Sequence, residues 1–345
     1  MRLDALLGHL ADFGEAALIE TLAAPALANH YAAGRNPALA ACARALGRER
    51  ARTFFAVLFA AVAPTHPGGC LDLWRRLTDG AFSGRRAEPG AWLDALIAAA
   101  PKARKTAEPL RLKRFGRDFV FPEKEGVDDN KDESAPAKDP LTPEALADAL
   151  GVMGGALGAP ACLPYIDAMA GNAEAFTPEM LLLPMLERLA EDSGASLVPG
   201  EAVARVWEHC ATFYLERSAA PPPEPRDWAQ SAKIAGSTAD PLLRELQAFA
   251  RDPDARERRF PAATAQRALL HRAIEQAGLD MTHVTERRGR PYTLVCTKTR
   301  TTHARALRRY RSDLADMRRL LAVPVAQAPD NAPTAARLHQ ALTAS

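Results

Sequence analysis

The stretch Phe260–Lys298, FPAATAQRALLHRAIEQAGLDMTHVTERRGRPYTLVCTK, changes from a helical to a strand-like pattern. Residues 262–278 carry Leu269, Leu270 and Ile274 on one side, as a helix packed on a core would, and Gly278 ends that helix. Residues 283–287 and 292–298 then read as two strands, and apolar and polar residues alternate in the second. This stretch therefore predicts a small module with a helix and a sheet.

Five residues, Arg287-Arg288-Gly289-Arg290-Pro291, join the two predicted strands. A glycine between two strands favours a tight hairpin, and it allows the backbone to approach a ligand closely. We expect a positively charged hairpin tip within reach of a phosphate backbone.

Predicted helices flank this stretch on both sides. Asp240-Pro241 is typical of a helix start, and Arg251-Asp252-Pro253 ends that helix. Residues 302–321 carry apolar side chains at alternating steps of three and four, which predicts a second helix with one packed seam. The seam consists of Leu307, Tyr310, Leu314, Met317 and Leu321. The arginines that we expect to face outward are Arg305, Arg308, Arg309, Arg311, Arg318 and Arg319.

Charge is distributed unevenly along the chain. Residues 251–320 contain 17 Lys+Arg and 8 Asp+Glu, a net charge of +9, and this leaves −7 for the rest of a chain whose net charge is +2. An acidic body with a basic C-terminal region indicates a surface that faces a polyanion.

The C-terminal module resembles a known family. The order Phe260-Pro261, Arg267-Ala268-Leu269-Leu270-His271, Gly278-Leu279, a basic turn and a strand that ends at Lys298 is similar to the Arg-x-x-x-His (R-three-H) domains. The resemblance covers residues 260–298 and implies a small helix-plus-sheet fold that binds single-stranded DNA or RNA. It also implies that Arg267 and His271 are the signature pair. The chain departs from the family in its very basic turn and in the extra helix that follows.

Arginine suits a nucleic-acid site because its planar guanidinium can hold two phosphate oxygens or stack on an unpaired base. The residues that we expect to bind nucleic acid are Arg267, His271, Arg287, Arg288, Arg290, Lys298, Arg300, Arg305, Arg308 and Arg309. The alternative is that Arg267 and His271 brace the sheet and that the outward arginines are ordinary solvated surface.

The rest of the chain predicts a mainly α protein, with helical N-terminal and middle blocks before the small α+β module. We expect six segments. They are a helical domain with a short hairpin (1–122), a disordered linker (123–140), a helical domain (141–218), a Pro-rich linker (219–239), the basic module (240–325) and a tail (326–345).

Several classes of site and location lack support in the sequence. The five cysteines are scattered, which argues against a disulfide framework or a zinc site, and we expect no cofactor and no metal. Phosphate-binding, dinucleotide-binding, hydrolase and zinc-protease motifs are absent from the sequence. The start of the chain lacks the apolar core of a secretion signal, and no apolar run is long enough to span a membrane. We expect a cytoplasmic protein.

Three functions follow from these patterns. The first is a non-enzymatic protein that binds single-stranded DNA or RNA and recruits other proteins through its acidic helical body. The second is a helical scaffold or adaptor subunit of a larger assembly, whose basic end docks on an acidic protein surface. The third is an unrecognised nuclease that uses acids beside the basic turn, such as Asp280 or Glu286.

Overall fold

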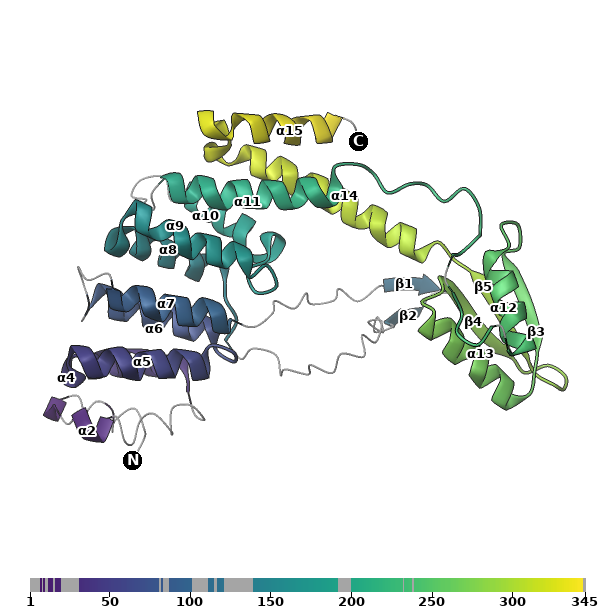
Figure 1. Ribbon diagram of the computed structural model, residues 1–345, viewed down its shortest axis with the longest axis horizontal. Helices are drawn as coiled ribbons and strands as arrows, with labels where there is room; N and C mark the ends of the chain where they lie inside the picture. The colour runs from purple at the N-terminus through teal and green to yellow at the C-terminus, as the bar shows by residue number, and fades with distance from the viewer. Residues whose placement is uncertain are drawn as a thin grey trace. The chain divides into compact units, whose positions relative to one another are not determined.

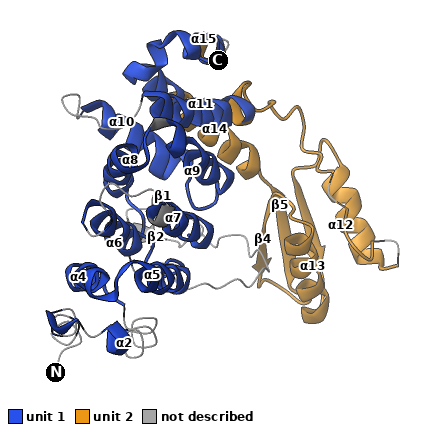
Figure 2. Ribbon diagram, turned by 60° about the vertical axis from the view of Figure 1, so that its left-hand side comes forward, with its two compact units in different colours: residues 1–216, 316–340 blue, residues 217–315, 341–345 orange. Residues whose placement is uncertain are grey.

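Helices make up most of the chain, and a three-stranded antiparallel sheet lies toward its C-terminus. The computed structural model divides into two units: unit 1 is residues 1–216 with 316–340, and unit 2 is residues 217–315 with 341–345 (Figure 2). The expectation of a mainly α protein with a small α+β module is confirmed. The structure describes residues 7, 9, 12–14, 16–19, 31–80, 82, 87–100, 111–114, 117–120, 139–191, 200–231, 233–237 and 239–343.

Unit 1 is built from helices that stack in pairs. α4 packs on α6, α5 on α7, α6 on α8 and α7 on α9 (Figure 1). The helices with most of their residues in this unit, and the short helical turns, are α2 (Ala16–Leu18), η2 (Ala33–Arg35), α4 (Asn36–Leu46), α5 (Arg48–Val62), α6 (Pro67–Asp79), α7 (Ala87–Ala99), α8 (Pro143–Leu157), α9 (Ala159–Gly171), the π-helical turn η3 (Pro178–Leu182), α10 (Leu183–Glu191), α11 (Gly200–Ser218), η4 (Pro324–Gln327), η5 (Pro329–Asn331) and α15 (Ala332–Thr343).

Buried tryptophans join the helices of unit 1. The indole N–H of Trp74 donates to the carbonyl of Pro89 at 2.8 Å, and that of Trp207 donates to the carbonyl of Leu320 at 2.9 Å. A buried indole needs such a partner, so these bonds fix how the helices pack. The segment that the sequence sets apart as a tail contains α15, whose Leu338 is fully buried.

A two-stranded antiparallel hairpin follows α7, where the sequence predicts one. Its strands are β1 (Arg111–Arg114) and β2 (Arg117–Val120), with Arg111 opposite Val120. The linker expected at 123–140 lies outside the described residues, apart from its last two positions.

Unit 2 follows the order helix, strand, helix, strand, strand, helix. Its elements are α12 (Pro241–Arg251), β3 (Glu257–Pro261), α13 (Thr264–Gln276), β4 (Met281–Glu286), β5 (Thr293–Lys298) and the first part of α14 (Thr301–Ala322). Asp240 caps α12, because its Oδ1 accepts hydrogen bonds from the amides of Leu242 and Leu243 at 2.8 and 3.1 Å. The predicted helices and the two predicted strands are present, and β3 is an addition.

The sheet has the order β3-β5-β4, so the last strand in sequence is the central one. Phe260 of β3 pairs with Leu294 of β5, and His283 of β4 pairs with Cys296 of β5. In β5, Leu294, Cys296 and Lys298 are buried and alternate with partly exposed residues, as expected for a strand with one covered face.

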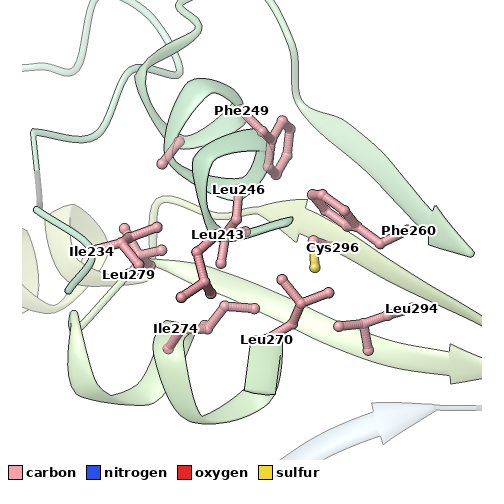
Figure 3. Packing of buried hydrophobic residues seen from close by; sticks show 12 residues of the cluster. Ile234, Leu243, Leu246, Phe249, Phe260, Leu270, Ile274, Leu279, Leu294 and Cys296 are labelled. Atoms are coloured by element: carbon pink, nitrogen blue, oxygen red, sulfur yellow. The ribbon is translucent and has the colours of Figure 1, made fainter. Parts of the chain in front are cut away.

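Helices α12 and α13 both pack on the covered face of the sheet. Leu246 and Phe249 from α12 and Leu270 and Ile274 from α13 join residues of β3 and β5 in one apolar cluster (Figure 3). Ile234, which lies before α12, belongs to the same cluster. The core of the module therefore reaches into the segment that the sequence assigns to the Pro-rich linker. Sheet residues on the other face are more open, and Val284 is 63% exposed.

Candidate nucleic-acid interface

The turn between β4 and β5 presents three of the expected site residues to solvent. Arg287, Arg288 and Arg290 are exposed, and Gly289 has the positive φ of 78° that a glycine adopts without strain. Among the described residues, none of these arginines has an acidic partner. Their positive charges are therefore available to an anionic ligand.

The first half of α14 provides a second group of exposed arginines. Arg305, Arg308 and Arg309 are exposed, whereas Tyr310 and Leu314 are buried on another side of the helix. Spacings of three and four residues bring the three arginines to one exposed side. Within the described part of the chain they too have no acidic partner. Of the expected seam, Tyr310, Leu314 and Met317 are buried, whereas Leu307 and Leu321 are half-buried and Leu320 is buried in addition.

Arg319 is partly exposed, but it is bound by acids and is not free as expected. It forms ion pairs with Glu187 at 2.5 Å and with Asp316 at 2.7 Å within unit 1, and these partners raise the pKa of its guanidinium. The apolar periodicity of α14 located its packed side but could not reveal these acids.

The two groups of exposed arginines lie at opposite ends of the sheet. The turn at Arg287–Arg290 precedes the start of β5 at Thr293, and α14 begins directly after the end of β5 at Lys298. A strand of this length spans roughly 17 Å at about 3.3 Å per residue. A small anion cannot contact both groups, whereas an extended polyanion can.

Arg267 of the signature pair is directed into the fold. It is only 9% exposed, and its guanidinium donates to the carbonyl of Ala262 at 2.5 Å and to the hydroxyl of Thr264 at 3.2 Å. It also lies 5.3 Å from the ring centre of Tyr292. These contacts join α13 to the ends of β3 and β5, so Arg267 braces the module.

His271, the second signature residue, packs against a histidine of the sheet. Its ring centre lies 4.5 Å from that of His283 on β4, in an edge-to-face arrangement. The pKa of His283 is lowered, first by burial and second by the proximity of His271, although Glu275 acts in the opposite direction. The Nδ1 atom of His283 is buried, and within the described ranges it has no hydrogen-bond partner. The pair joins α13 to β4, and the lowered pKa of His283 favours its neutral imidazole.

Lys298 is fully buried at the end of β5. Its ammonium donates to the carbonyl of Asp252 at 2.5 Å and lies 4.7 Å from the ring centre of Phe249. The strand alternation that buries Leu294 and Cys296 also turns Lys298 inward. It therefore offers no exposed charge to a ligand.

Two arginines of β3 are neutralised locally. Arg258 pairs with Glu245 at 2.6 Å, and Arg259 pairs with Glu286 and with Glu257. Some basic residues of the module are therefore paired with acids and others are not. The net charge alone does not distinguish the two.

The two acids of the nuclease hypothesis have structural partners. Asp280 accepts hydrogen bonds from the hydroxyl of Thr299 and from the amides of Thr301 and Thr302, at 3.3 and 2.8 Å for the amides, and so caps α14. Burial would raise the pKa of Asp280, but these bonds outweigh burial and lower it. Glu286 is paired with Arg259. In the described ranges, no three His, Cys, Asp or Glu side chains are grouped to hold a metal ion.

Sequence reasoning missed an aromatic contact at the α14 end of the sheet. The guanidinium groups of Arg256 and Arg300 lie 4.9 and 4.7 Å from the ring centre of Trp228. Arg300 is among the expected site residues, but Arg256 and Trp228 are not. A tryptophan within an otherwise polar, Pro-rich segment is the signal that could have indicated this contact.

Comparison with protein-family models, with curated proteins and with solved structures finds no match to this chain. The interpretation of the site therefore depends on the chemistry of its residues.

Among the described residues, no helix combines the length and the apolar character that crossing a bilayer requires.

Proposed function

We propose that this protein binds nucleic acid through unit 2 and is not an enzyme. The observation that carries the proposal is that six of the expected site arginines, in the β4–β5 turn and on α14, are exposed and, within the described residues, lack an acidic partner. They are Arg287, Arg288, Arg290, Arg305, Arg308 and Arg309.

The position of the free arginines at both ends of the sheet supports a long ligand. A nucleic-acid backbone carries regularly spaced charges and can contact both groups at once. The resemblance of residues 260–298 to the Arg-x-x-x-His domains supports a single strand of DNA or RNA as this ligand. Within the proposal, Arg267 and Lys298 maintain the fold and do not contact phosphate. The role fits the cytoplasmic location expected from the sequence, where nucleic acid is present.

The test is a binding titration of the full chain with single-stranded DNA, duplex DNA and RNA at two salt concentrations. Six phosphate contacts would give a slope of log affinity against log salt of about −4 on a single strand. Replacing Arg287, Arg288 and Arg290 by Gln removes three of these contacts. We expect affinity to fall for every sequence tested and the slope to become shallower by about 2.

A matched control removes the same charge from unit 1. Arg44, Arg50 and Arg52 are also exposed, and the variant Arg44→Gln/Arg50→Gln/Arg52→Gln loses three positive charges in the other unit. It should bind like the wild type. Equal losses in both variants, or no binding by the wild type, would contradict the proposal.

The stacked helix pairs of unit 1 favour a second role, the recruitment of proteins. Such stacks present extended surfaces that other proteins bind. A pull-down from lysate with and without nuclease treatment separates the alternatives. Partners that all survive nuclease treatment would favour a helical scaffold, and partners that are all lost would favour nucleic-acid binding alone.

A further inference from the structure

Three loops meet at the α14 end of the sheet. One precedes β3 and contains Arg256, one precedes β4 and contains Asp280, and one follows β5 and contains Arg300. The amide of Lys298 donates to the carbonyl of Arg256 at 2.9 Å, and the amide of Thr299 donates to the carbonyl of Asp280 at 2.8 Å. These bonds extend the sheet and hold the three loops side by side.

Trp228 is held firmly at this end of the sheet. Its amide donates to the carbonyl of Pro253 at 2.9 Å. Gln230, two residues later, exchanges hydrogen bonds with Asp280: its side-chain amide donates at 2.8 Å and its side-chain oxygen accepts at 2.9 Å. Ile234 then enters the core. The indole is therefore positioned before any ligand arrives, which reduces the entropy lost on binding.

The cluster of Trp228, Arg256 and Arg300 remains accessible. Both arginines are exposed, the indole is half-buried, and neither guanidinium has an acidic partner among the described residues. The nearby acids Asp280 and Asp252 serve other groups: Asp280 caps α14, and Asp252 accepts hydrogen bonds from the amides of Asp254 and Ala255. The cluster thus offers flat cationic and aromatic groups, and neither of its guanidinium groups is held in an ion pair with a described acid.

Flat groups of this kind match the face of a nucleobase. Guanidinium planes and indoles stack on unpaired bases, and such stacking tolerates any base. Arg300 lies directly before α14, so phosphates that flank a stacked base would lie near the arginines of that helix. In a duplex each base is already stacked on its neighbours and is not available to the cluster.

We propose that Trp228, Arg256 and Arg300 form a stacking site for an unpaired nucleobase, which makes unit 2 selective for single strands. This inference rests on the proposed function. The competing explanation is that the two arginines only fasten the segment 228–234 to the sheet, in which case bases would contribute nothing to binding.

The chain provides its own probe of this site. Of its four tryptophans, Trp74, Trp92 and Trp207 are fully buried in unit 1, so quenching of emission by an added strand reports mainly on Trp228. The full chain is titrated with a short oligoadenylate, with an abasic oligonucleotide of the same length and with a duplex of equal phosphate number. Affinity is measured by anisotropy of labelled strands.

We expect the oligoadenylate to quench emission and to bind about tenfold more tightly than the abasic strand, as stacking of one base would produce. The duplex should not quench. The variant Arg256→Lys/Arg300→Lys retains both charges but removes both planar groups. It should therefore retain its affinity for the abasic strand and lose most of the preference for bases. Trp228→Leu should show the same loss, and circular dichroism checks that both variants are folded.

The two proposals fail in different ways. Equal affinity for the oligoadenylate and the abasic strand, without quenching, overturns the stacking site and leaves phosphate binding by unit 2 intact. Absence of binding to either strand overturns the proposed function and the stacking site with it. A lysine variant that retains the full preference for bases also overturns the stacking site.

Discussion

The ammonium of Lys298 donates a hydrogen bond to the main-chain carbonyl of Asp252, at 2.5 Å, from a fully buried position. Lys298 is the last residue of β5, and Asp252 directly follows α12. The bond therefore joins the central strand to the turn that leads into β3. A residue that the sequence suggested as a ligand contact stabilises the fold instead.

We predict that Lys298→Met preserves nucleic-acid affinity within about twofold, because an inward ammonium contributes no contact and Met has a similar volume. Lys298→Ala should lower the free energy of unfolding of unit 2 by about 2 to 4 kcal/mol through the cavity that it leaves. Hydrogen exchange of the β5 amides measures this loss. A large loss of affinity in the folded Met variant would show that Lys298 contributes to ligand binding.

Burial lowers the pKa of Lys298, against the opposing charges of Asp252 and Asp227. In the folded state the lysine therefore loses its proton at a lower pH than in the unfolded state, where it does so near 10.5. At pH values below the pKa of the folded state, Lys298 is protonated in both the folded and the unfolded state. Folding then carries the full free-energy cost of burying the charged ammonium. Between the two values stability should rise with pH in the wild type relative to Lys298→Met. Unfolding followed across that range measures the difference.

The arginines of α14 should contribute to affinity independently of the turn. We expect Arg305→Gln/Arg308→Gln/Arg309→Gln to weaken binding of single strands and to make the salt slope shallower by about 2, as for the turn variant. Because the two groups lie at opposite ends of the sheet, the losses should add in the combined variant. If the combined variant is no weaker than either triple variant, the two groups do not contact one ligand.

The burial of His283 against His271 should make unit 2 sensitive to mild acid. The pKa of His283 is lowered, mainly by burial, so the unfolded state takes up a proton near the ordinary value of 6.5 while the folded state does not. Stability is therefore lost as pH falls below that value toward the lowered pKa. Hydrogen exchange of the β4 and β5 amides should accelerate in this window. His283→Gln should remove the effect, and the exposed control His339→Gln should not.

Asp280 should matter for the start of α14 and not for cleavage. Asp280→Ala removes the cap and should cost about 1 to 2 kcal/mol, with faster exchange of the amides at Thr301 and Thr302. Asp280→Asn retains an oxygen acceptor and should cost less. Metal-dependent cleavage by the wild type that either variant abolishes would revive the nuclease hypothesis.

The sequence predicts the elements of unit 2 whose patterns are periodic. α12, α13, β5 and α14 lie close to their expected bounds, because caps, glycine and apolar spacing act locally. β3 could not be predicted: within Glu257–Pro261 only Phe260 is buried, so no alternation marks it. Its strand structure comes from pairing with β5, which is distant in the chain.

The candidate site was predictable only in part, because partners decide which cations are free. Arg287 and Arg258 are both exposed arginines of a basic module, yet only Arg258 faces an acid, Glu245 on α12. Trp228 could not be placed, since the bonds that hold its segment come from Pro253, in the turn after α12, and from Asp280. Such pairings depend on tertiary contacts, which a single sequence does not encode in a readable pattern.

The central position of β5 has a consequence for synthesis on the ribosome. Neither β3 nor β4 has a sheet partner until β5 emerges, since the two are not paired with each other. Nascent chains halted before Thr293 would thus expose the apolar sides of α12 and α13 with no sheet to cover them. Unit 2 should acquire its protease resistance in one late step of translation, after Lys298 has left the exit tunnel.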